Sequence, residues 1–156
     1  MPRITMVVGI PCSGKSTHVA AALAGTDQLV LNQDSYGIPY PACRDLLDAD
    51  LEAALASGQD FILDWTGTGK TTLEWAERAI DEGFALEVVF VECSLEEALR
   101  RVRLRNAEGG RQVPEEAIHR CHEDLWRVEA LGALADRFVR VRSGGDAPSA
   151  DTGERG

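Results

Sequence analysis

The chain is poor in lysine. Its 156 residues include only two lysines, Lys15 and Lys70, against fourteen arginines. A lysine ammonium is a compact charge on a flexible stem, whereas guanidinium is a broad planar fork. A lysine retained where arginine is the default cation therefore indicates a need for a point charge. Both lysines lie in glycine-rich stretches, "GIPCSGKST" (9–17) and "GTGKTT" (67–72).

Other features are missing as well. There is no apolar run of eighteen residues and no secretory pattern at the start, so we expect a soluble, cytoplasmic protein that contacts no membrane and requires no protein partner. The four cysteines form no CxxC pair, which argues against a disulfide framework or a zinc ribbon. The net charge of −10 opposes a long phosphate backbone, so any contact with nucleic acid should be local.

Apolar runs alternate with helical patterns along the chain. We expect strands at 3–10, 28–34, 60–64, 85–92 and 137–141, with helices between them, the last helix running without a break from about 114 to 134. This alternation predicts an α/β domain with a mostly parallel sheet covered by helices on both faces. We assign the domain to residues 1–142 and predict a disordered tail over 143–156 because that segment is small, polar and rich in Gly and Pro.

The first glycine-lysine stretch fits the Walker A spacing G-x-x-x-x-G-K-[ST] between a predicted strand and a predicted helix. Such a loop cradles phosphates with its backbone N–H groups, so we predict ATP and Mg²⁺ as ligands. Lys15 would reach the β- and γ-phosphates, and the Ser16 hydroxyl would coordinate Mg²⁺. The predicted nucleotide-binding residues are Gly9, Pro11, Cys12, Ser13, Gly14, Lys15, Ser16 and Thr17.

The second stretch fails this spacing because Asp64 stands where the first glycine would fall. It follows a strand and precedes a helix, at the sheet edge where ligands bind in open α/β folds. We therefore predict that it faces the phosphoryl acceptor, with Thr66 and Lys70 as contacts. The alternative is that its threonines are turn or cap residues and Lys70 is solvated surface.

Two acids end neighbouring strands. Asp34, in "LNQDSY", is predicted to act as the base that orients an acceptor hydroxyl, or else it is a turn aspartate. Asp64 could bind the acceptor, hold Mg²⁺ through water, or cap the next helix.

Arginines gather between residues 100 and 111, next to paired glycines. We predict a lid at about 105–113 that closes over bound nucleotide, with Arg105 and Arg111 contacting phosphate. Arg100 and Arg103 are expected to form surface pairs with Glu96 and Glu97.

Taken in order, "GIPCSGKST", "LNQDSYG", "FILDWTGTGKTTLEWA" and "GGRQVPEEAI" resemble the kinase domain of phage-type polynucleotide 5′-kinases and, more broadly, the P-loop kinase group that includes zeta toxins. The resemblance implies a three-layer fold whose five-stranded parallel sheet has the order 2-3-1-4-5. It also implies that Lys15 and Ser16 hold phosphate and Mg²⁺, that Asp34 activates the acceptor, that Asp64 helps to hold it, and that Arg105 or Arg111 reaches the ATP phosphates. After the second strand, polynucleotide kinases of this type have a stretch like "NRDDYR", whose last arginine binds the 3′-phosphate of the acceptor. This chain has "NQDSYG" instead, with Gly37 at the position of that arginine.

The sequence thus predicts a Mg²⁺/ATP-dependent kinase of a hydroxyl acceptor, with nucleic acid favoured, either as a polynucleotide 5′-hydroxyl or as a hydroxymethylated base in DNA. The first alternative is a small-metabolite or nucleotide-sugar kinase like the zeta toxins. The second, of another class, is an NTP-binding switch without a dedicated acceptor.

Overall fold

Six strands form one sheet in the order β2-β3-β1-β4-β5-β6 in the computed structural model, which describes residues 1–23, 25–109, 112–142 and 150–154. The strands are β1 (Arg3–Val8), β2 (Leu29–Asn32), β3 (Phe61–Asp64), β4 (Ala85–Glu92), β5 (Arg137–Arg142) and β6 (Ala150–Glu154). The first five are parallel, which confirms the predicted α/β fold and the order 2-3-1-4-5.

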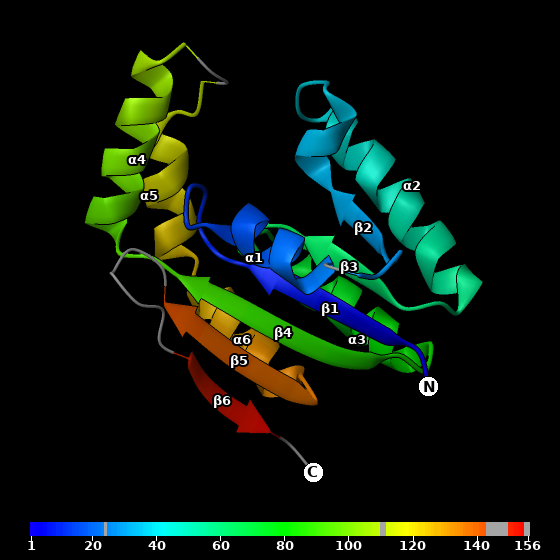
Figure 1. Cartoon of the computed structure of the whole chain (residues 1–156). Coiled ribbons are helices and arrows are strands. Elements are labelled where there is room, and N and C mark those ends of the chain that lie inside the picture. The colour runs from blue at the N-terminus through cyan, green and yellow to red at the C-terminus, as the bar shows by residue number, and fades with distance from the viewer. Residues whose placement is uncertain (24, 110–111, 143–149, 155–156) are drawn as a thin grey trace.

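Helices cover both faces of this sheet. In Figure 1, α1 lies in front of the sheet, α3 and α6 lie behind it, and α2 runs beside β2. The helices are α1 (Lys15–Leu23), α2 (Ala42–Ser57), α3 (Thr72–Asp81), α4 (Leu95–Ala107), α5 (Glu115–Glu123) and α6 (Trp126–Leu134), with a 3₁₀ turn η1 (Gln33–Tyr36) after β2. None of these helices is long and apolar enough to serve as a membrane span.

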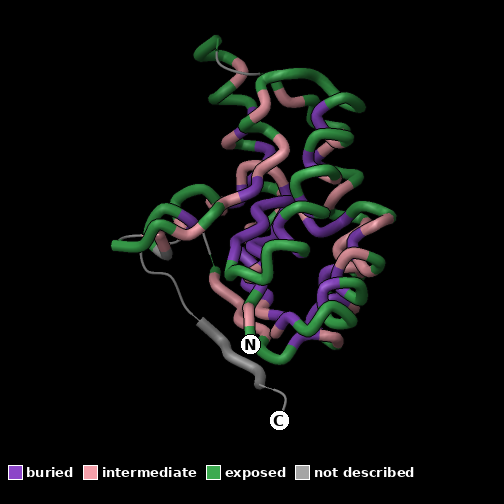
Figure 2. The backbone as a smooth tube through the Cα atoms, turned by 90° about the vertical axis from the view of Figure 1, so that its right-hand side faces the viewer, coloured by how far each residue is buried: buried purple, intermediate pink, exposed green. Residues whose placement is uncertain are grey.

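The core follows from the alternation of side chains along the strands. On β1, Met6 and Val8 join a large apolar cluster with residues of α2, α3 and α6, whereas Val7 packs with Val19 of α1 on the opposite face. A parallel strand between two helical layers is buried on both faces, which explains its continuous apolar run. Figure 2 shows the buried residues gathered at the centre of the molecule, inside a shell of exposed helical surface.

The carboxyl ends of β1, β2 and β3 meet at one edge of the sheet, because parallel strands in register end together. Two arms border this edge in Figure 1, one made of α4 and α5 and the other of η1 and α2, which starts near η1 and runs back beside the sheet. The loops that leave the three strands therefore lie between the two arms.

The single helix predicted over about 114–134 is in fact two helices, α5 and α6. The amides of Leu125 and Arg127 donate to carbonyls three residues back, to His122 at 3.3 Å and to Asp124 at 3.0 Å, so the chain tightens and turns here. The turn has a packing reason. Ile118 of α5 is buried against α4, whereas Val128 of α6 is buried against the sheet, and one straight helix would not reach both clusters.

The tail also differs in part from the prediction of disorder over 143–156. Residues Ala150–Glu154 form β6, which pairs antiparallel with β5 from Arg137↔Glu154 to Val141↔Ala150. Backbone pairing at a sheet edge satisfies N–H and C=O groups that an edge strand leaves open, and it needs no large apolar side chain. Residues 143–149 and 155–156 lie outside the described part of the chain.

Candidate functional site

The loop between β1 and α1 has the backbone geometry of an anion cradle. Gly9 and Gly14 have φ values of 155° and 100°, and Cys12, which is not a glycine, has φ 66°. A Cβ built on Gly9 would lie 2.6 Å from the carbonyl oxygen of Val91, so a side chain does not fit there. The Gly9 amide donates to the Thr66 carbonyl at 3.1 Å, which joins this loop to the second glycine-rich stretch.

Lys15 folds back over this loop. Its Nζ donates to the carbonyl oxygens of Gly9 at 2.8 Å and Ile10 at 3.1 Å. Burial lowers the pKa of Lys15 below its ordinary value of 10.5, and the nearby carboxylate of Asp64 opposes that shift. The ammonium therefore sits within the cradle, held by neutral carbonyl dipoles and facing an acid.

A buried hydroxyl in this loop, that of Ser13, is available to a bound phosphate. Ser13 is 1% exposed, and its Oγ has no hydrogen-bond partner among the described residues. A buried polar atom without a partner is costly unless a ligand or water satisfies it. With the positive-φ glycines and Lys15, this hydroxyl makes the loop suited to a bound phosphate, and Ser16 at the start of α1 is the residue that would hold Mg²⁺.

Two acids stand opposite the loop, and one asparagine positions both. Asp64 ends β3, is 6% exposed, and accepts a hydrogen bond from the side-chain amide of Asn32 at 3.0 Å. The Oδ1 of Asn32 accepts from the backbone N–H of Asp34 at 2.8 Å and so caps η1, which carries Asp34. Burial raises the pKa of Asp64 above 3.8, opposed by Lys15 and by the Asn32 hydrogen bond, while Asp34 adds to the rise.

These groups line one cavity of about 440 Å³ between the two arms. That volume lies within the range of small-molecule sites, roughly 300–1,000 Å³. From the predicted site the cavity includes the loop residues 11–17, Asp34, Asp64, Thr66 and Arg105. The cavity thus brings together the predicted loop residues 11–17 and both predicted acids, whereas Gly9, also predicted to bind nucleotide, does not line it.

Lys70 is placed elsewhere. It is exposed and does not line the cavity. Thr66 does line it, and its hydroxyl lies 2.9 Å from that of Thr68. The carbonyl of Thr68 accepts from Arg127 of α6 at 2.8 Å. The second glycine-rich stretch is therefore held by α6, and the residue before it, Thr66, is held by the Gly9 amide.

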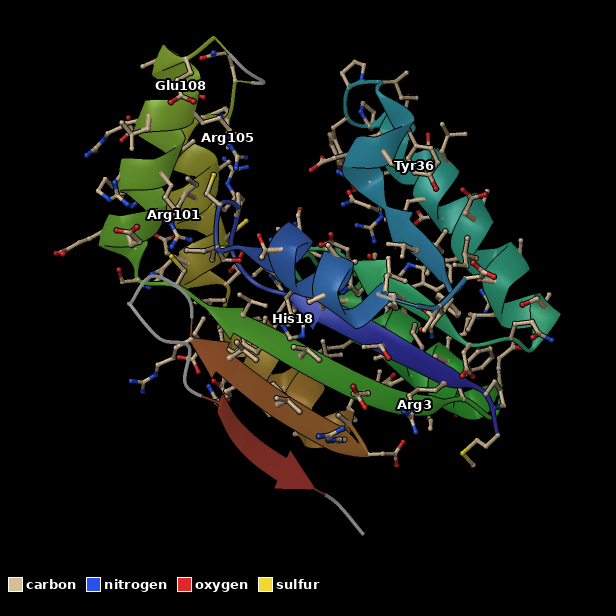
Figure 3. All side chains as sticks on the ribbon, in the orientation of Figure 1. Arg3, His18, Tyr36, Arg101, Arg105 and Glu108 are labelled. Atoms are coloured by element: carbon tan, nitrogen blue, oxygen red, sulfur yellow. The ribbon has the colours of Figure 1, made fainter. Side chains whose placement is uncertain are left out.

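The arginines of α4 take different positions. Arg105 lines the cavity, and Arg111 falls outside the described residues. Figure 3 shows Arg101 and Arg105 about one turn apart on α4, in the arm opposite Tyr36. Arg101, which the sequence analysis did not single out, donates from Nη1 to the carbonyl of Cys12 at 3.0 Å and thereby links α4 to the phosphate-binding loop.

The other two arginines of α4 form surface pairs. Arg100 pairs with Glu97 at 2.6 Å, as expected, and Arg103 pairs with Glu115 at 2.7 Å instead of Glu96 or Glu97. Near the end of α4, the Asn106 side chain donates to the Val113 carbonyl at 3.0 Å and accepts from the Val113 amide at 3.1 Å.

One cavity cation was missed by sequence reasoning. Arg44, in the first turn of α2, lines the cavity together with Trp65 and Gly69. The only signal in the sequence was an arginine ten residues after Asp34, which by itself does not distinguish a site residue from helix surface.

Known proteins share this fold. A family model described as an AAA domain matches residues 4–127, and no curated protein matches the sequence. A chain of the Pnkp1/Rnl/Hen1 RNA repair complex is 20% identical with a TM-score of 0.68, over 83% of this chain and 45% of that one. A chain of the PezAT toxin-antitoxin system of Streptococcus pneumoniae is 11% identical with a TM-score of 0.69, over 95% and 72%.

A gluconokinase from Sinorhizobium meliloti is 19% identical with a TM-score of 0.60, over 92% of this chain and 84% of that one. At these identities the similarity shows a shared fold, which confirms the predicted resemblance at that level. The present chain spans less than half of the RNA repair chain.

Proposed function

Because the chain belongs to the AAA domain family, with a P-loop that binds ATP, we propose that it is a Mg²⁺/ATP-dependent kinase that transfers the γ-phosphoryl group to an acceptor hydroxyl. One observation carries the proposal. The phosphate-binding loop, two strand-end acids and a lid-side arginine line the same cavity. A nucleotide switch uses one such acid to hold Mg²⁺, so the second acid is the group that favours a bound acceptor.

In the proposed reaction the acceptor oxygen forms a bond to the γ-phosphorus while the bond to the bridging oxygen of ADP breaks. Asp34 orients the acceptor hydroxyl and takes its proton. Asp64, held by Asn32, helps to bind the acceptor. Lys15 neutralises charge on the β- and γ-phosphates. Ser16 would hold Mg²⁺, which would supply further charge neutralisation when bound.

The lid is proposed to be the segment 105–113. Arg105 borders the cavity and would cover the phosphates from the α4 arm, with Arg111 as the second predicted contact. Asn106 ties the end of α4 to Val113 through two hydrogen bonds, which connect described residues on either side of positions 110 and 111.

A nucleic-acid hydroxyl is the first acceptor we propose, in line with the resemblance and with the fold shared with an RNA repair protein. The second is a small metabolite. It is favoured by the acidity of the acceptor side, where Asp34 and Asp64 would repel successive phosphates of a polynucleotide, and by the fold shared with a gluconokinase.

The test is transfer of label from γ-labelled ATP with Mg²⁺ to a panel of 5′-hydroxyl DNA, 5′-hydroxyl RNA, hydroxymethyluracil DNA, nucleosides, sugar nucleotides and sugar acids. We expect label in at least one acceptor class. ATP hydrolysis without label in any of them would overturn the kinase proposal in favour of a nucleotide switch.

A further inference from the structure

We propose that Arg44 binds an anionic group of the acceptor, so that the substrate is a small hydroxyl compound carrying one carboxylate or phosphate. This inference rests on the proposed kinase function and deepens it by choosing the second acceptor class, the small metabolite, over nucleic acid and by naming its charged group. It assigns a role to a residue that the sequence motifs do not reach.

Arg44 lines the cavity from the arm that also carries Asp34. Its side chain is 22% exposed, and it lines the cavity together with Asp34, Asp64 and Trp65, on the arm opposite Arg105. Asp34 and Arg44 thus line the same cavity from the same arm, so one acceptor molecule can contact both. Lys15 and Arg105, the other cations among the described lining residues, belong to the phosphate loop and to the α4 arm.

The guanidinium is held in place by three contacts. Its Nε donates to Asp48 Oδ1 at 2.9 Å, its Nη2 donates to the hydroxyl of Thr71, and its Cζ lies 5.6 Å from the centre of the Trp65 ring. A stacked and hydrogen-bonded arginine loses little further freedom when it binds an anion, which favours affinity.

Binding capacity remains after these contacts. Guanidinium has five N–H donors. Two are used by Asp48 and Thr71, and Nη1 has no acceptor among the described residues. Nη1 lies near Gly69, which has no side chain; a Cβ built there would be 4.0 Å from Nη1. The unused N–H groups of Nη1 and Nη2 can donate side by side, and a carboxylate or phosphate is the group that accepts two such hydrogen bonds.

The surrounding charge sets the size of the acceptor. Arg44 stands among acids, with Asp34 and Asp64 in the cavity and Asp45 and Asp48 on the same helix. One anion can be held at Arg44, but a chain of phosphates would meet carboxylates on either side and has no second cation on this arm among the described cavity residues. The ion pair with Asp48, which is 41% exposed, is screened by water and competes only weakly.

A purely structural role for Arg44, as a clamp between α2 and the "GTGKTT" loop, makes different predictions. The chain contains a matched control. Arg78 on α3 also lies over a tryptophan ring, 5.5 Å from the centre of Trp75, and also pairs with an acid of α2, Glu52, but it lies outside the cavity. Thr71→Val is the second control, because it removes the loop contact and leaves the charge.

The experiment measures kcat and KM for two matched acceptor pairs, a six-carbon sugar acid against its polyol and a nucleoside 3′-phosphate against its nucleoside, with a 5′-hydroxyl oligonucleotide alongside. We expect the wild type to prefer the acidic member of one pair. Arg44→Gln should raise KM for that member roughly tenfold to a hundredfold, the value of one or two charge-assisted hydrogen bonds, and leave KM for ATP within about twofold. Arg78→Gln and Thr71→Val should keep the preference.

The outcomes separate the two proposals. Equal use of acidic and neutral members, a better rate on the oligonucleotide that Arg44→Gln leaves unchanged, or loss of preference in Thr71→Val would overturn the role of Arg44 while the kinase function stands. The two pairs distinguish a carboxylate from a phosphate. No transfer to any acceptor despite ATP hydrolysis would overturn both proposals.

Discussion

At the scale of single residues, Asn32 joins the two acids of the site. One side-chain amide donates to Asp64 and accepts from the backbone of Asp34, so the positions of both carboxylates depend on it. The register of β2 and β3 places Asn32 directly beside Asp64. A change at Asn32 should therefore act on the acceptor side of the cavity and leave the phosphate-binding loop intact.

We predict that Asn32→Ala lowers kcat for phosphoryl transfer by about tenfold or more, because misplaced reacting groups lose much of their effect. The Kd for ATP should change by less than about twofold. Ser35→Ala is the control, since the Ser35 hydroxyl contacts the Asn32 carbonyl in the same turn but neither acid. Equal losses in ATP affinity and in kcat would contradict this view of Asn32.

The ionised carboxylate of Asp64 is expected to lower the free energy of unfolding. Its pKa is raised by burial above 3.8, so the folded state binds the proton more tightly than the unfolded state. Stability is then lost as pH rises from 3.8 through the folded pKa, and it stays lost above it. Asp64→Asn should raise the thermal unfolding midpoint at pH 7, with a gain that shrinks as pH falls toward 3.8, and should lower transfer.

The measurement is a series of thermal unfolding curves against pH, with Asp27→Asn at an exposed position as the control. A lower midpoint for Asp64→Asn at pH 7 would show that the carboxylate stabilises the fold, against this account.

At the scale of elements, the strand-loop-helix unit from β1 to α1 depends on Gly9. Its φ of 155° and the 2.6 Å separation between a built Cβ and the Val91 carbonyl leave no room for a side chain. Gly58 also has a positive φ, 67°, but a Cβ there would meet nothing within 4 Å. The two glycines therefore separate backbone strain from steric exclusion.

We predict that Gly9→Ala destabilises the fold by roughly 2–4 kcal/mol and abolishes ATP binding, because strain and overpacking act together. Gly58→Ala should cost only about 1–2 kcal/mol, the strain of a left-handed residue, and should bind ATP normally. Denaturant unfolding and ATP titration of both variants check this. Similar losses in the two variants would mean that strain alone matters at Gly9.

At the scale of the whole molecule, the parallel sheet places the site, and this part was readable from the sequence. Apolar runs that end at Gly9 and Asp64, with helical patterns between them, predict strands whose carboxyl ends meet. The predicted loop residues and acids then share a cavity. What could not be read depends on contacts between distant residues. Arg44 reaches Thr71 across 27 positions and Arg101 reaches Cys12 across 89, and no local pattern specifies such pairs.

The two departures in the fold have the same origin. The break between α5 and α6 serves two separate apolar clusters, and β6 is held by backbone pairing to β5, so neither leaves a periodic signal. Local propensity indicates which segments are regular, but tertiary packing decides where a helix turns and which edge a strand covers.

The central claim is that the phosphate loop and the acids perform different parts of one transfer reaction. It is tested most directly by measuring ATP binding and labelled phosphoryl transfer in Lys15→Ala and Asp34→Asn beside the wild type. We predict that Lys15→Ala loses transfer entirely, whereas Asp34→Asn keeps its Kd for ATP within about threefold and loses at least about a hundredfold in transfer. Transfer at wild-type rates in either variant would contradict the account.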